Sequence, residues 1–399
     1  MRVLVLHSRY ASGPSSGENR VVEDEVQLLR SAGHDVHLWS PMPDDPTTGS
    51  RIGLALSAVW SRTAVAEVRR FERELRPDVV HVHNLFPLLS PAVLRASSAP
   101  VVVTLHNYRL LCLPAVFLRD GKACEDCLGK LPWRGVVHRC YRGSAAGSAA
   151  LATALGVHRR AGTFGHVAMF LAVSDFVREK HLEAGFDPDR IRVKPNFTAP
   201  LPRRSGPGRD FLFLGRLSEE KGLDRLVALW HDVPARLVVV GDGPERARLE
   251  AMAPATVEFR GSVPSDQVAG FLREARALVL PSICYEGAPR TVVEAYAAGV
   301  PVVANRYGAL PSVVTNDITG LLVEPGDAGA WRSALGSVLD DGVSERLGEG
   351  AFAAWRSGYS PEQALAELEA AYDMVTASAR KKRPRTDDGQ MAKTGGWRA

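Results

Sequence analysis

The chain has 399 residues, of which 45% are hydrophobic and 24% are charged. A length above the roughly 100 to 200 residues of one ordinary domain predicts two domains, and the apolar content excludes disorder throughout. The net charge of +4 is too small to create a field that captures nucleic acid, so we expect no nucleic-acid partner.

The first half of the chain, residues 1–195, is predicted to be a doubly wound α/β domain. The strand RVLVLHS, a Gly/Ser/Pro loop, a helix over about 20–32 and the strand DVHLWS form a βαβ opening, which predicts a parallel sheet with its ligand crevice at the carboxyl ends of the strands. Further strands rich in apolar residues are expected at 78–84, 100–107 and 169–177. A Cys-containing insertion with little core of its own interrupts this order at about 111–143.

The second half repeats the same rhythm after a Pro/Gly/Arg/Ser linker at 196–209. Six strand candidates separated by helical stretches predict a second parallel α/β domain over 210–360, and two such domains facing each other would form a cleft. The helical pattern over 361–378 is expected to pack back toward the first domain. The basic segment 379–399 has few apolar residues and is predicted to be a disordered tail.

Targeting signals are not evident in the sequence. The opening MRVLVLHSRY enters a strand at once, and no stretch reaches the roughly 18 apolar residues of a membrane span. We therefore expect a cytoplasmic protein. The Ala-rich and Arg-containing stretch near 158–160 is expected to be a solvated helix, with a peripheral contact at the inner face of the cell membrane as the alternative.

The most informative segment is YEGAPRTVVEAYAAGVPVVAN, residues 285–305. Glu286 lies in a loop after an apolar strand, Pro289 suits the first turn of a helix, and Glu294 follows on that helix. A helix start attracts a phosphate or a hydroxyl, and carboxylates accept hydrogen bonds from sugar hydroxyls. Two solvated helix-start glutamates would explain either residue taken alone.

A second segment, FLFLGRLSEEKGLDRLV, places Gly215 and Arg216 at the end of a strand and Lys221 at the start of the next helix. Two cations beside a glycine can neutralise a diphosphate, the arginine by a forked contact and the lysine as a point charge. Such a pair of cations is also common on protein surfaces without any ligand-binding role.

Together these segments resemble the E-x7-E and GR-x4-K elements of the retaining glycosyltransferases of family 4. The resemblance implies the GT-B fold, an α/β arrangement of two facing Rossmann-like domains, in which the C-terminal domain binds a nucleotide sugar. The donor-binding residues that it implies are Gly17, Gly215, Arg216, Lys221, Val263, Glu286, Gly287, Ala288, Pro289, Arg290 and Glu294.

The resemblance also implies roles. Arg216 and Lys221 would bind the diphosphate, Glu286 would position the hexose, Glu294 would hold the ribose, and backbone near Val263 would meet the base. Catalysis would involve His106, Arg216, Lys221 and Glu286. The turn VVVGDGPE at 238–245 is expected to line the crevice as a structural turn.

The N-terminal half offers weaker candidates. Gly17 allows a close backbone approach to a phosphate, although its loop lacks the full dinucleotide-binding pattern. Glu18 and Asn19 are candidates facing the acceptor. His106 ends a strand and is expected to donate a hydrogen bond to the transferred sugar or to share charge with a phosphate. His83 is expected to border the cleft.

Four cysteines, Cys112, Cys124, Cys127 and Cys140, fall in or beside the insertion. Four thiolates can close a structural zinc site, and the C-x2-C pair suits that geometry. Inert thiols explain the pattern equally well, so both readings stay open. Cys284 is expected to pack beside the donor loop.

The sequence thus predicts an enzyme that moves a hexosyl group from a UDP- or GDP-sugar to an unidentified acceptor, with retention and without a metal or other cofactor in the chemistry. Polysaccharide, glycolipid and natural-product biosynthesis all remain open. A nucleotide-sugar epimerase of the same fold and a non-catalytic nucleotide-sugar or polysaccharide-binding protein are the alternatives.

Overall fold

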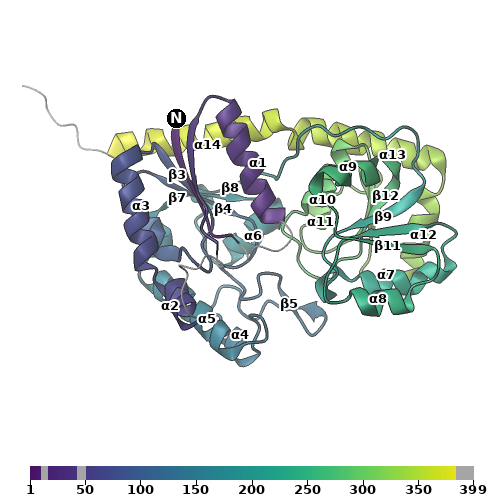
Figure 1. Ribbon diagram of the computed structural model, residues 1–399, viewed down its shortest axis with the longest axis horizontal. Helices are drawn as coiled ribbons and strands as arrows, with labels where there is room; N and C mark the ends of the chain where they lie inside the picture. Colours follow the sequence, from purple (N-terminus) through teal and green to yellow (C-terminus); the bar gives the residue numbers. More distant parts are fainter. Residues whose placement is uncertain (10–16, 43–50, 383–399) are drawn as a thin grey trace, which may run out of the picture.

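The computed structural model describes residues 1–9, 17–42 and 51–382. Within these residues, two six-stranded sheets form two halves that lie side by side (Figure 1). The strand pairs of both large sheets are parallel. The predicted fold class of two doubly wound α/β domains is therefore confirmed.

The N-terminal sheet has the strand order β2-β1-β3-β4-β7-β8. Its strands are β1 (Arg2–His7), β2 (Asp35–Trp39), β3 (Val79–Asn84), β4 (Val101–Leu105), β7 (Val167–Ala172) and β8 (Ile191–Val193). The chain moves from β1 to β2 and then crosses to β3 on the other side of β1. In open parallel sheets, ligands bind at such a reversal, beyond the carboxyl ends of the strands.

The C-terminal sheet has the order β11-β10-β9-β12-β13-β14, with its reversal between β9 and β12. Its strands are β9 (Asp210–Leu214), β10 (Leu237–Val240), β11 (Val257–Gly261), β12 (Ala275–Leu280), β13 (Val302–Asn305) and β14 (Gly320–Val323). Each of the six strand candidates in this half forms a strand. The two motifs that resemble donor-binding elements follow β9 and β12, the strands at the reversal.

Helices cover both sheets, and several begin at side-chain caps such as Ser174, whose hydroxyl accepts from Val177 N at 3.2 Å. The N-terminal half contains α1 (Gly17–Ser31), α2 (Arg51–Val59), α3 (Arg62–Leu75), α4 (Trp133–Val137), α5 (Ala145–Arg160) and α6 (Asp175–Glu183). The C-terminal half contains α7 (Leu223–Leu229), α8 (Arg246–Met252), α9 (Ser265–Glu274), α10 (Arg290–Ala297), α11 (Leu310–Val313), α12 (Ala328–Val338) and α13 (Asp341–Ala354). Among the described residues, no helix is both long and apolar enough to cross a membrane.

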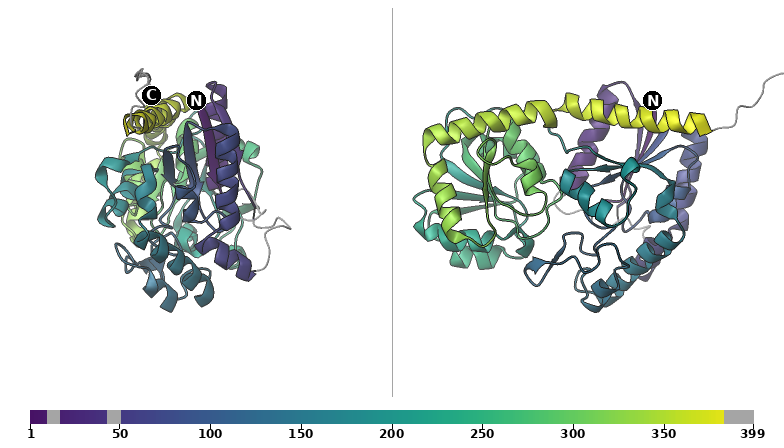
Figure 2. Two further views of the ribbon diagram at one scale, coloured as in Figure 1. Left: turned by 90° about the vertical axis from the view of Figure 1, so that its left-hand side faces the viewer. Right: turned by 180° about the vertical axis from the view of Figure 1, so that it is seen from behind.

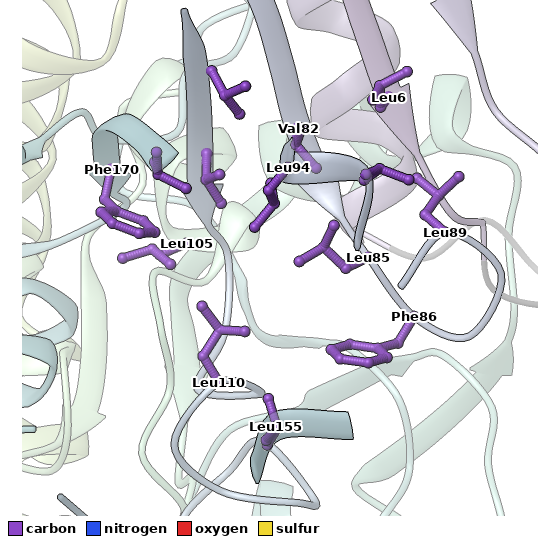
Figure 3. Close-up of a cluster of buried hydrophobic side chains, with 14 of the residues drawn as sticks. Leu6, Val82, Leu85, Phe86, Leu89, Leu94, Leu105, Leu110, Leu155 and Phe170 are labelled. Carbon is purple, nitrogen blue, oxygen red and sulfur yellow. The ribbon is translucent and has the colours of Figure 1, made fainter. Parts of the chain in front are cut away.

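The core follows from strands that are buried on both faces. Leu4 and Leu6 of β1 belong to one apolar cluster, while Val3 and Val5 belong to another on the opposite face of the sheet. Burial on both faces is the reason that these strands read as continuous apolar runs. Figure 3 shows part of the first cluster, which Leu155 of α5 joins.

The last helix, α14 (Pro361–Lys382), follows the C-terminal half in sequence but packs on the N-terminal half (Figure 2). Leu368, Ala371, Tyr372 and Val375 are buried in one cluster with residues of the N-terminal sheet. Helix α14 therefore connects the C-terminal half to the N-terminal half.

Two boundaries differ from the prediction. The helix was expected to end at 378, but α14 continues to Lys382, because Arg380 and Lys381 are good helix formers whose charge is favourable near a helix C-terminus. Residues 379–382 are thus helical rather than part of a disordered tail, and the rest of the predicted tail, 383–399, lies outside the described residues. The sequence also did not predict β8, because three residues are too few to show a period.

The insertion at 111–143, which was expected to have little core of its own, joins the main core of the N-terminal half. Leu111, Leu113 and Phe117 are each 0% exposed and belong to the first N-terminal cluster. A short antiparallel hairpin follows, made of β5 (Leu118–Arg119) and β6 (Lys122–Ala123). Apolar packing therefore anchors the base of the insertion.

Replacing Leu368 with Ala should destabilise the N-terminal half, because a cavity would open where α14 meets the sheet. Leu368 is 0% exposed, and such substitutions cost about 2–5 kcal/mol. Met374→Ala on the same helix is the matched control, since Met374 is 38% exposed and should cost about 0.5 kcal/mol or less. Urea unfolding followed by circular dichroism measures both, and equal effects would contradict the packing of α14.

Candidate functional site

The two motifs meet at the strand reversal of the C-terminal sheet. Their loops are joined directly, since Ile283 N donates to Glu220 O at 3.0 Å. Gly222 has a φ of +63°, and a Cβ atom there would lie 2.3 Å from Pro281 O. Only glycine fits this turn, and the close approach places the preceding residue, Lys221, against the loop that carries Glu286.

Lys221 and Glu286 form the central ion pair of the site. Lys221 Nζ lies 2.7 Å from Glu286 Oε1, which also accepts from Ser282 Oγ at 2.6 Å. Burial alone would raise the pKa of Glu286, but the Lys221 ammonium and these hydrogen bonds bring it below its ordinary value. Burial alone would lower the pKa of Lys221, but Glu286 raises it. Both groups are therefore charged at neutral pH.

The turn VVVGDGPE packs behind the first motif, as expected of a structural turn. A Cβ atom at Gly241 would lie 1.8 Å from Gly215 O, and one at Gly243 would lie 2.2 Å from Leu217 O. Side chains at these glycines would push the turn away from the loop that bears Arg216.

The loop 285–288 is bound to the N-terminal half through its backbone. Tyr108 Oη donates to Glu286 O at 2.9 Å, Ser174 Oγ to Gly287 O at 2.7 Å, and Asn196 Nδ2 to Ala288 O at 2.9 Å. These three side chains come from three separate segments of the chain. The predicted sugar-binding loop is therefore located by both halves.

Gly287 lies against the strand end that carries His106. A Cβ atom at Gly287 would lie 2.7 Å from His106 O. Glycine at this position thus allows the backbones of the two halves to approach each other, and it brings two predicted site residues together.

Arg290 and Glu294 form a second link between the halves. Arg290 Nε lies 2.7 Å from Glu294 Oε1, and Arg290 Nη1 lies 2.6 Å from Asp24 Oδ2 on α1. All three side chains are largely buried. Two residues that the sequence places in the donor site are thus held in position by an ion pair with α1.

His106 belongs to a buried polar network in the N-terminal half. His106 Nε2 lies 2.9 Å from His83 Nδ1, and His83 Nε2 lies 3.4 Å from Glu25 Oε1. Burial by itself would raise the pKa of Glu25, but Lys194, whose Nζ bonds the other carboxylate oxygen, holds it well below its usual range. Burial and the neighbouring His83 lower the pKa of His106.

His83 lies between Glu25 and His106. In the contact between His83 Nδ1 and His106 Nε2 one ring nitrogen donates and the other accepts, and this contact holds the His106 ring in place. The expectation that His106 donates a hydrogen bond to a transferred sugar stays a prediction.

Glu25, His81 and His83 are close enough to hold a metal ion, with ligand atoms within 4.8 Å of one another. The ammonium of Lys194 already contacts Glu25, and a divalent cation would be repelled by it. His81 also bonds Tyr372 Oη and Thr104 Oγ1, each at 2.7 Å. Glu25 therefore forms a buried ion pair with Lys194, and His81 and His83 lie beside that pair.

Other predicted residues occupy more open positions. Arg216 is exposed, and among the described residues no ion pair of its guanidinium is seen within 4.0 Å. Gly17 begins α1 with open space around it, and Val263 follows β11 half-buried. Asn19 does not face an acceptor as expected: it is 7% exposed and its Oδ1 lies 2.8 Å from His7 Nε2.

The four insertion cysteines are free thiols. Among the described residues, no three of their sulfurs lie within 4.8 Å of one another. Burial raises the pKa of Cys112 to about 12, which favours a thiol over the thiolate that zinc requires. A zinc site here would need the sulfurs to draw together, and it stays a prediction.

Comparisons with known proteins bear on this arrangement. Residues 208–341 match the family described as Glycosyl transferases group 1, and residues 15–200 match the Glycosyltransferase Family 4. A 2-deoxystreptamine glucosyltransferase from Streptomyces kanamyceticus is 30% identical over 324 residues, covering 74% of this chain and 77% of that protein. The chain belongs to the family 4 glycosyltransferases.

Other relatives of this glycosyltransferase differ in their named acceptors. The phosphatidyl-myo-inositol mannosyltransferase of Mycolicibacterium smegmatis is 27% identical, over 79% of each chain. Among solved structures, sucrose-phosphate synthase from Thermosynechococcus elongatus has a TM-score of 0.72 at 20% identity, covering 95% of this chain and 100% of that one. Anabaena HepE, solved with UDP and glucose, has a TM-score of 0.65 at 16% identity, covering 94% and 100%. These likenesses show the GT-B fold.

Sequence reasoning missed the residues that join the halves of the glycosyltransferase. Tyr108, Ser174 and Asn196 each lie shortly after a strand, which is the only signal that could have singled them out. Asp24 and Glu25 sit within a helix and read as ordinary solvated charges. Their partners in the linkage, Lys194 for Glu25 and Arg290 for Asp24, are more than a hundred residues away, so no local pattern reveals them.

Gly287→Ala should lower the turnover of the glycosyltransferase by up to about 10²-fold. The added methyl group would lie too close to His106 O and would push the loop away from it by up to about 1 Å. Gly270→Ala is the matched control, since nothing lies within 4 Å of a Cβ atom there. Initial rates of donor consumption measure both variants. Wild-type rates for Gly287→Ala would mean that the close approach is not needed for the reaction.

Glu25→Gln should cost about 3–5 kcal/mol of stability, because Lys194 would remain buried without a counter-charge. The double variant Glu25→Gln/Lys194→Met removes both charges and should recover most of that loss. Urea unfolding in neutral buffer measures the difference, and equal stability of the single and double variants would contradict the pairing.

The same ion pair gives a pH dependence. The folded-state pKa of Glu25 is lowered, so its contribution is fully present above the unfolded pKa of about 4.3 and is lost as the pH falls through the folded value. The free energy of unfolding of the wild type should therefore fall relative to that of the double variant as the solution is made acidic.

Proposed function

We propose that this glycosyltransferase takes a hexosyl group from a nucleoside-diphosphate sugar and transfers it, with retention, to an acceptor hydroxyl. The observation that carries the proposal is the Lys221–Glu286 pair at the strand reversal, 2.7 Å apart. It sets a cation for a diphosphate directly beside a carboxylate for sugar hydroxyls. HepE was solved with UDP-glucose, which supports this class of donor.

Each side chain has a role set by its charge and position. Lys221 and the exposed Arg216 bind the diphosphate, and when a phosphate takes over Lys221, the Glu286 carboxylate is released to bind the hexose. Glu294 holds the ribose. Arg290 fixes Glu294 and joins it to α1, so nucleotide binding is connected to the position of the N-terminal half.

The reaction needs no protein nucleophile. The acceptor oxygen forms a bond to the anomeric carbon on the face from which the diphosphate leaves, while the bond from that carbon to the β-phosphate oxygen breaks. The acceptor proton passes to the departing phosphate oxygen. Lys221 and Arg216 stabilise the charge that develops there, and the chemistry proceeds without a metal ion.

The N-terminal half supplies the acceptor side. The backbone of His106 lies against Gly287, and its imidazole is suited to hydrogen-bonding a sugar or acceptor hydroxyl. No side chain of the described site selects between the uracil of a UDP-sugar and the guanine of a GDP-sugar, and none identifies the acceptor. Polysaccharide, glycolipid and natural-product biosynthesis all fit this reaction.

Lys221→Ala and Glu286→Ala should each lower turnover by about 10²- to 10³-fold, because each removes a charged group that acts on the transferring sugar or its leaving group. Arg248→Ala, whose side chain is 56% exposed in the same half, is the charge-matched control and should keep wild-type activity. Circular dichroism checks that the folds are intact. Unchanged product formation by both active-site variants would refute the assignment.

The reaction itself is tested by mass spectrometry of products after UDP- and GDP-sugars are offered with a panel of acceptors. Acceptor-dependent release of the nucleotide and a product heavier by one hexosyl unit support transfer. Isomerised nucleotide sugar without an acceptor would instead indicate an epimerase, and tight donor binding without turnover would indicate a binding protein.

A further inference from the structure

Exposed apolar side chains gather on one edge of the N-terminal half, formed by α2, α4 and α5. These helices lie opposite the edge that α14 covers (Figures 1 and 2). Of the nine large hydrophobic side chains described as exposed, five belong to these helices or to the residue after α2. They are Leu56 at 67%, Trp60 at 45%, Trp133 at 50%, Val137 at 78% and Val157 at 41% exposed.

The same edge is strongly cationic. From residue 127 to residue 174 the chain contains no Asp or Glu. The exposed basic residues of this stretch are Lys130, Arg134, Arg139, Arg142 and Arg160. Arg134 Nη1 lies 3.3 Å from Asp126 Oδ2, while Arg142 lies over the Tyr141 ring. Among the described residues, the other three form no ion pair within 4.0 Å.

The helices form one continuous surface. α5 contacts both α2 and α4. The Trp60 ring stacks on His158 of α5, with ring centroids 5.2 Å apart, and His158 Nε2 also bonds Val59 O at 2.9 Å. Arg159 donates to Lys130 O at 2.5 Å, which ties the insertion to α5. Apolar and basic groups are therefore carried by helices and an insertion that pack directly against one another.

We propose that this face, made of the five apolar and five basic residues given above, docks the enzyme on a bilayer that contains anionic phospholipid. Tryptophan and aliphatic side chains beside an excess of cations are the composition of surfaces that lie in the headgroup region. Arginines attract the anionic headgroups, and the apolar groups enter the acyl boundary.

A protein partner or a nucleic acid fits this face less well. A protein interface concentrates apolar groups at its centre and carries polar groups at its rim, whereas four of the five cations of this face have no ion-pair partner among the described residues. Nucleic acid would use the arginines but leave Val137 and Leu56 facing water. Bilayer docking uses both kinds of group, and it gives the insertion a role separate from the transfer reaction.

Binding is tested by co-sedimentation of the full chain with two kinds of vesicle, phosphatidylcholine alone and phosphatidylcholine mixed with phosphatidylglycerol. We expect sedimentation only with the mixed vesicles, weakened by salt because the attraction is partly electrostatic. Trp133→Ser/Val137→Ser removes apolar contact, and Arg139→Glu/Arg142→Glu reverses two charges. Each should reduce the bound fraction at least about tenfold.

Ile318→Ser/Arg356→Glu is the matched control. It changes one exposed apolar and one exposed basic residue in the C-terminal half, and it should bind as wild type does. Circular dichroism and nucleotide release with water-soluble acceptors establish that every variant is folded and functional. Failure of wild type to sediment with mixed vesicles, or equal binding by the docking variants and the control, would overturn the proposal whatever the outcome for glycosyl transfer.

Discussion

The site depends on the backbone of residues 286–288 being shared by both halves. Its carbonyl oxygens accept hydrogen bonds from Tyr108, Ser174 and Asn196. Because these acceptors belong to the backbone, a side-chain substitution within the loop does not remove them. A loop that follows β12 of one sheet is thereby positioned by strand ends of the other. Because the same loop carries Glu286, the distance from its carboxylate to the N-terminal residues is set by main-chain geometry.

Buried charge in the N-terminal half serves the same arrangement. Glu25 and Lys194 lie more than a hundred and sixty residues apart in sequence, and their ion pair holds α1 to the segment that leads into the linker. His83 and His106 extend this pair toward Gly287, while His81 connects it to Tyr372 on α14. Separating a buried ion pair leaves uncompensated charge in the core, so the network favours one relative position of sheet, helix and linker.

The two halves differ in how closely their side chains specify a ligand. Around Lys221, opposite charges lie side by side in two loops joined through their backbones, which is the arrangement that we propose for a diphosphate and a sugar. On the N-terminal side, neutral imidazole and amide groups offer hydrogen bonds without a strong preference of charge. The relatives that act on 2-deoxystreptamine and on phosphatidyl-myo-inositol, by their names, illustrate that one fold accommodates different acceptors through such loops.

The sequence by itself determined the two parallel sheets, the strands of the C-terminal half, and the family to which the motifs around Lys221 and Glu286 belong. Those features are local: apolar runs give strands, and a glycine beside a cation gives a loop at a strand end. Only the tertiary structure decided that Asn19 turns inward to His7, that His106 contacts His83, and that Arg290 bridges to Asp24. Each of these depends on contacts between segments far apart in the chain, whose pairing no local period or spacing encodes.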